Sequence, residues 1–138
     1  MLEYIVSRCT DDGVIEEIVL EINEEHIFRR INERLMGIMH MDLLIEALDN
    51  AFKLEEVFTP IFYDMKYGEG FIIELKDYNC SVLCSVKDIE TVKVSSVWRG
   101  YHFRKGVGQH IIQIRDKVVK LFTFEEGGRY IVWNPCEA

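Results

Sequence analysis

The sequence predicts a single α+β domain over residues 1–138, with an N-terminal β-hairpin, a helical pair and a C-terminal antiparallel sheet packed against the helices. Strand-like alternation at the N-terminus gives way to helical periodicity after residue 23, and mainly strand-like runs follow residue 60. A run of helices followed by a run of strands is typical of α+β domains. A length of 138 residues with 49% hydrophobic residues suits one domain with an ordinary core.

The N-terminal hairpin is predicted from two strand-like segments and the turn between them. Residues 2–7 alternate in the manner of a strand, and residues 10–13 form a turn in which Gly13 can take a positive φ. Residues 14–22 are predicted to form the second strand. The adjacent acidic residues Glu16 and Glu17 break the alternation there, so a helix over 14–22 remains the alternative.

Two amphipathic helices are expected next. Asn23 is a suitable N-cap for the first helix, two acidic residues occupy its first turn, and Gly37 is a suitable stop. The apolar stripe of the first helix consists of Ile27, Phe28, Ile31 and Leu35. The apolar stripe of the second consists of Leu43, Leu44, Ala47, Leu48, Ala51 and Phe52. Because the connecting segment 36–41 is short, an antiparallel pair is expected.

The C-terminal half is predicted to form strands. The expected strands are residues 71–75, 80–86, 92–98, 110–114, 118–124 and 130–133. Cys80 and Cys84 then share one strand face with Val82 and Val86, which predicts buried free thiols rather than a disulfide or metal site. No CxxC spacing is present, and His26 and His40 lack metal-ligand spacing to another His or Cys, so no metal or cofactor is expected.

The segment at the N-terminus lacks the basic and apolar regions of a secretory signal, and no apolar run approaches the ~20 residues of a membrane span. A cytoplasmic location with reduced cysteines is therefore expected.

Charge is divided unevenly along the chain. Residues 1–90 carry 8 Lys and Arg against 20 Asp and Glu, whereas residues 91–138 carry 8 against 4. The overall net charge is −8. Such asymmetry bears on partners and on the rate of encounter with them rather than on the fold.

The acidic side chains near the hairpin and the first helix are the leading candidate for a partner-binding face. They are Asp11, Asp12, Glu16, Glu17, Glu21, Glu24 and Glu25. An acidic face can steer a basic protein and occupy a surface meant for nucleic acid. The leading hypothesis is therefore a non-catalytic inhibitor of a basic protein such as a nuclease toxin, resembling immunity proteins and antitoxins in charge and size only. A solvated helix face with weak i, i+4 pairs is the simpler explanation of the helical acids.

The alternative hypothesis is a nucleic-acid or phosphate-ligand site in segment 98–120, with binding or hydrolysis as its function. Arg99, Arg104 and Lys105 would hold phosphate, and His102 or His110 would transfer protons. The glycines there match neither a P-loop nor a dinucleotide-binding fingerprint, and the net charge of −8 opposes non-specific binding of nucleic acid. A third hypothesis is an assembly subunit that pairs through an edge strand at 130–133. The oligomeric state stays open.

Overall fold

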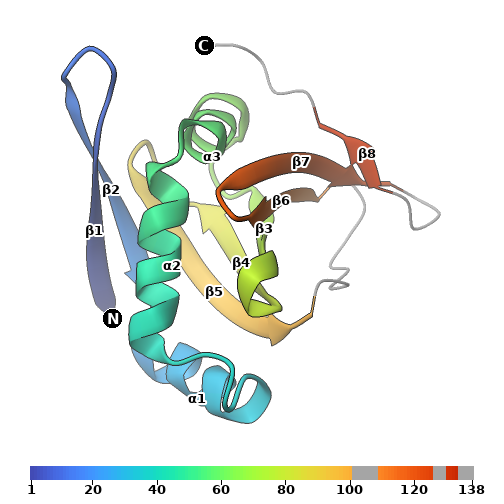
Figure 1. The fold of residues 1–138 in the computed structure, drawn as a ribbon. Coiled ribbons are helices and arrows are strands. Elements are labelled where there is room, and N and C mark those ends of the chain that lie inside the picture. Colours follow the sequence, from blue (N-terminus) through green and yellow to red (C-terminus); the bar gives the residue numbers. More distant parts are fainter. Residues whose placement is uncertain (101–108, 126–129, 134–138) are drawn as a thin grey trace.

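In the computed structural model, residues 1–100, 109–125 and 130–133 are described, and they form one sheet with helices packed against it (Figure 1). The strands are β1 (Leu2–Cys9), β2 (Ile15–Ile22), β3 (Gly70–Leu75), β4 (Cys80–Val86), β5 (Thr91–Arg99), β6 (His110–Arg115), β7 (Val118–Phe124) and β8 (Tyr130–Val132). The helices are α1 (Glu24–Arg34), α2 (Met41–Lys53) and α3 (Glu55–Thr59), followed by a π-helical turn at Pro60–Asp64. A short 3-10 turn, Lys76–Tyr78, joins β3 to β4. The predicted α+β class is confirmed.

The eight strands have the order β1-β2-β5-β4-β3-β6-β7-β8. The N-terminal hairpin is therefore part of the same sheet as the C-terminal strands, because β2 pairs in parallel with β5. β3 also pairs in parallel with β6, and the other neighbouring strands are antiparallel. Both parallel pairs join strands separated by long connections, as parallel pairing requires.

The strand interpretation of residues 14–22 is confirmed, because β2 covers Ile15–Ile22. Its register places Glu16 opposite Arg8, and Ile18, Leu20 and Ile22 follow on the same buried face. Glu16 is thus inward-facing yet paired with a cation, which explains how an acidic residue fits the buried face of a strand.

Both predicted helices form, but not as the expected antiparallel pair. In Figure 1, α1 lies across the lower end of α2 instead of beside it. The helix α1 packs mainly on β5, whereas α2 contacts β1 and α3, and the two helices make few contacts with each other. Phe28, expected in the apolar stripe of α1, is 55% exposed, whereas Phe52 of α2 is fully buried.

Side chains cap both helices at their N-termini. The Asn23 side chain accepts a hydrogen bond from the backbone N–H of His26 at 3.2 Å, which confirms its predicted N-cap role. His40 performs the same function for α2, since its Nδ1 accepts from the backbone N–H of Leu43 at 3.2 Å. This role accounts for a histidine that has no partner apparent in the sequence.

The cysteines of β4 are buried as predicted. Cys80 and Cys84 have free thiols in the core beneath the helices, together with Val82 and Val86. Burial disfavours the thiolate and raises the pKa of Cys80 to about 12, and it raises the pKa of Cys84 as well. Cys9, by contrast, lies exposed at the end of β1.

This difference predicts selective thiol chemistry. In a Cys136→Ser background, an aromatic disulfide reagent at about pH 8 should modify Cys9 rapidly and Cys80 and Cys84 only after unfolding. The thiols of Cys80 and Cys84 hold their protons more tightly in the folded protein than in the unfolded chain. Above pH 9.0, the ordinary thiol pKa, the unfolded chain therefore loses these protons first, and the unfolding free energy should fall as pH rises. Rapid modification of three thiols in the folded protein would contradict the buried placement of β4.

Candidate functional site

Arg8 anchors the outer end of the N-terminal hairpin to α3. Its Nη1 donates a hydrogen bond to Oε2 of Glu16 at 2.7 Å, and its Nη2 donates to Oε2 of Glu55 at the start of α3. The guanidinium lies over the ring of Phe58, 4.1 Å from the ring centroid. The Arg8 side chain is 5% exposed, so two carboxylates and an aromatic face stabilise a buried charge.

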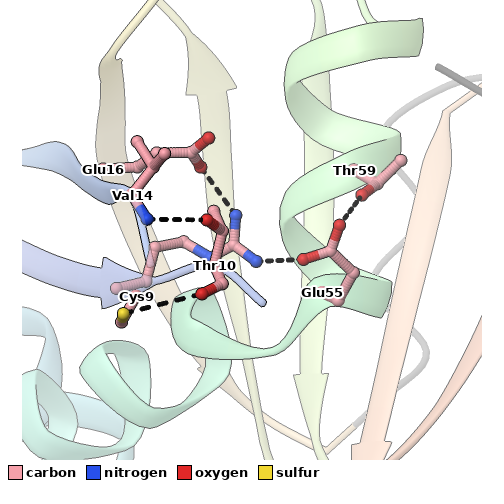
Figure 2. Close-up of polar contacts among 7 residues, drawn as sticks. Cys9, Thr10, Val14, Glu16, Glu55 and Thr59 are labelled. Carbon is pink, nitrogen blue, oxygen red and sulfur yellow. Dashed lines mark hydrogen bonds and ion pairs between the residues drawn. The ribbon is translucent and has the colours of Figure 1, made fainter. Parts of the chain in front are cut away.

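Figure 2 shows how these contacts join two elements that are distant in the sequence. Glu16 approaches from the hairpin, and Glu55 approaches from α3. The hydroxyl of Thr59 donates to Oε1 of Glu55 at 3.1 Å and so holds the carboxylate that faces the hairpin (Figure 2). The free end of the hairpin is therefore fixed against the helical layer.

The turn of the hairpin is closed by its own hydrogen bonds. The backbone N–H of Thr10 donates to the carbonyl of Val14 at 2.8 Å, and the N–H of Val14 donates to the Thr10 hydroxyl at 3.1 Å (Figure 2). Gly13 adopts a φ of +80°, a conformation that other residues rarely take. This closed turn presents Asp11 and Asp12 at the tip of the hairpin.

A surface hollow of about 390 Å³ lies between this turn and α3. We call it the acidic hollow. Four of the residues that line it carry carboxylates, namely Asp11, Asp12, Glu16 and Glu55. Arg8 neutralises part of this charge, but its guanidinium is already bound to Glu16 and Glu55. Counting the residues of the lining that the structure describes, the net charge is −3.

The acidic hollow is suited to receive a cationic side chain. Asp11 and Asp12 are exposed, and within the described part of the chain neither forms an ion pair. Phe58 and Tyr63 supply an aromatic wall, and Tyr63 is 57% exposed. Carboxylates beside aromatic rings bind ammonium and guanidinium groups through charge-assisted hydrogen bonds and cation–π contacts. Arg8 already occupies such an environment inside the protein.

The other predicted acids lie elsewhere. Glu21 is at the far end of β2, five residues or about 16 Å from Glu16, and its Oε2 accepts from Nζ of Lys87 at 2.7 Å. Glu24 and Glu25 follow in the first turn of α1. Glu17 is exposed on the opposite face of the hairpin from Glu16. The structure thus brings Asp11, Asp12 and Glu16 together and places the remaining four apart from them.

The residues of the alternative hypothesis are only partly described. His102, Arg104 and Lys105 lie outside the described residues. Arg99 is exposed at the C-terminal end of β5, and His110 begins β6. Because β5 and β6 run in the same direction, Arg99 and His110 lie at opposite ends of the sheet.

His110 belongs to a packed polar cluster. Its ring stacks on Trp133 with centroids 4.0 Å apart, and Nε1 of Trp133 donates to Oδ2 of Asp64 at 2.7 Å. Nδ1 of His110 lies 3.1 Å from the Thr123 hydroxyl, and Nε2 lies 3.2 Å from Oε1 of Glu69. Both ring nitrogens therefore have side-chain partners, and the cluster ties β6 and β7 to the residue that follows β8.

Six of the nine residues that line the acidic hollow are absent from the sequence-based candidates, namely Arg8, Thr10, Val14, Glu55, Phe58 and Tyr63. Glu55, Phe58 and Tyr63 belong to α3 and to the π-helical turn, and the sequence pattern predicts neither element. The one sequence feature that indicates α3 is the acidic pair at residues 55 and 56, because acidic residues favour the first turn of a helix. Their approach to the hairpin depends on tertiary packing, which no local pattern encodes.

The Arg8 contacts predict a specific loss of stability. Replacing Arg8 with Leu should lower the unfolding free energy by about 1–3 kcal/mol, because hydrogen bonds to charged groups are lost from a buried position. Water can solvate the partly exposed carboxylates of Glu16 and Glu55 in the variant. The loss of unfolding free energy is therefore smaller than the loss expected on breaking a fully buried ion pair. Urea denaturation measures the change.

The matched control is Arg30→Leu, because the ion pair of Arg30 within the described residues is an i, i+3 pair with Glu33 on α1. That pair should contribute about 0.2–1 kcal/mol. Equal losses in the two variants would show that Arg8 does not anchor the hairpin.

The described residues contain neither a membrane-spanning helix nor a cluster of metal ligands. No helix among them is long and apolar enough to cross a membrane. Over residues 1–100, 109–125 and 130–133, no group of three or more His, Cys, Asp or Glu side chains is placed to hold a metal ion.

Comparison with protein-family models, curated proteins and solved structures finds no match to this chain.

Proposed function

We propose that the protein is a non-catalytic binding protein for a basic protein partner, and that the acidic hollow receives a Lys or Arg side chain of that partner. The partner belongs to the class of cationic nucleic-acid enzymes, such as a nuclease toxin, and the protein inhibits it in the manner of an immunity protein or antitoxin. The observation that carries the proposal is the net charge of −3 in an open hollow with an aromatic wall.

The charge distribution supports this proposal. The first 90 residues carry 20 acidic against 8 basic residues, so the surface around the hollow belongs to the acidic part of the chain. Complementary charge accelerates encounter and fixes the orientation of the partners. The anchored hairpin adds rigidity, since the Arg8 contacts hold its end against α3 before a partner arrives.

The proposal is tested by affinity capture from host lysate at about 0.1 M salt, where charges act over about 10 Å. The parent protein is compared with a tip variant, Asp11→Lys with Asp12→Lys. A base variant, Glu24→Lys with Glu25→Lys, changes the net charge equally at the other end of β2. Circular dichroism verifies that each variant is folded.

The proposal predicts that a basic protein is retained by the parent and the base variant and lost from the tip variant. Addition of the parent protein should also inhibit that partner's activity on nucleic acid. If the basic proteins retained by parent and tip variant are the same, or if the base variant alone loses them, the acidic hollow is not the binding site.

A further inference from the structure

A second hollow on the described surface is basic. It has a volume of about 460 Å³ and lies beside the turn that joins β6 to β7. We call it the basic hollow. Gln113 and Arg115 of its lining alternate along β6 with Ile112 and Ile114, which are core residues beneath the helices. The basic hollow therefore opens on the face of the sheet opposite the helices.

Three cations from three different elements line the basic hollow. Arg115 ends β6, Lys120 lies in β7, and Lys76 begins the 3-10 turn that follows β3. Strand pairing explains how they meet, because β6 pairs with both β3 and β7. Lys76 is distant from the other two in the sequence, so the fold itself gathers these charges.

The charges of the basic hollow are incompletely neutralised. Arg115 and Lys120 form no ion pair with any residue in the described part of the chain. Lys76 places its Nζ 3.8 Å from Oε1 of Glu74, but that oxygen also accepts from Nε2 of Gln113 at 2.7 Å. Glu74 is 1% exposed and lies beneath the surface.

One acidic residue, Asp116, also lines the basic hollow. Its backbone N–H donates to Oδ2 of Asp77 at 2.9 Å, which secures the turn against the segment after β3. Asp116 and Lys117 both adopt positive φ, the conformation of a tight hairpin turn. With Lys76, Arg115 and Lys120 against Asp116, the described lining has a net charge of +2 in a protein of net charge −8.

We propose that the basic hollow binds the phosphate group of a small phosphorylated ligand. Arg115 can donate two parallel hydrogen bonds to phosphate oxygens, and Lys76 and Lys120 supply point charges. The volume lies within the range of roughly 300–1,000 Å³ typical of small-molecule sites. The site uses none of the residues assigned to the acidic hollow, so it stands independently of the proposed protein partner.

The test is an NMR titration of the ¹⁵N-labelled protein with pyrophosphate at constant ionic strength. Amide signals of residues 113–120 should shift in the parent. The variant Arg115→Gln with Lys120→Gln should bind pyrophosphate at least tenfold more weakly. Lys93→Gln is the control, because Lys93 is an exposed β5 cation near the opposite end of the sheet and its change should leave affinity within about twofold.

Separate titrations with a nucleoside triphosphate and with a short single-stranded RNA distinguish the sources of phosphate. Binding of pyrophosphate or the triphosphate at residues 113–120 supports the proposal. It is overturned if neither shifts these signals at about 10 mM, if only the RNA binds, or if the double variant binds pyrophosphate as tightly as the parent.

Discussion

Replacing Phe52 with Ala is expected to lower the unfolding free energy by about 3–5 kcal/mol, the largest change in stability that we predict. Phe52 is fully buried on α2 and packs in the core between the helices and the sheet. Its truncation removes a large apolar contact area and leaves a cavity that the surrounding strands can fill only in part. Urea denaturation followed by circular dichroism measures the loss.

The matched control is Phe28→Ala, which makes the same chemical change on α1. Since Phe28 is 55% exposed, the expected change lies within about 0.5 kcal/mol. A comparable loss in both variants would contradict the exposed position of Phe28 on α1.

Reversing the two charges at the hairpin tip is expected to cause the largest change in binding. For a basic partner identified by capture, the tip variant Asp11→Lys with Asp12→Lys should raise Kd at least a hundredfold at about 0.1 M salt. Each hydrogen bond between charged groups contributes about 1.5–3 kcal/mol, and the new lysines add repulsion. Titration calorimetry measures the affinity, and the base variant is the control.

The parent affinity should weaken as salt rises, and the tip variant should lose most of this dependence. An affinity of the tip variant within a few fold of the parent would exclude Asp11 and Asp12 from the interface.

Local patterns in the sequence predict most of the elements of this fold. The strands β4 and β7 have the predicted bounds, and Asn23 caps the first helix as expected. Such features depend on alternation, helical periodicity and capping groups within a few residues of one another. The tight turn at Asp116 and Lys117 lies between the two predicted strands at residues 110–114 and 118–124.

Long-range pairing accounts for what the sequence does not predict. The parallel pairing of β2 with β5 joins residues such as Val19 and Thr91, and no local pattern specifies it. For the same reason, the contribution of Glu55 to the acidic hollow and of Lys76 to the basic hollow becomes apparent only in the folded chain. Charge composition indicates an acidic and a basic part, but the topology selects which charges meet.

The measurement that tests the central proposal most directly is an NMR titration of the ¹⁵N-labelled protein with the basic partner. The proposal predicts that the perturbed amide signals cluster at residues 10–16 of the hairpin and 55–63 of α3 and the π-helical turn, the segments that border the acidic hollow. Perturbations confined to the far end of β2 and the first turn of α1, with residues 10–16 and 55–63 unchanged, would contradict it.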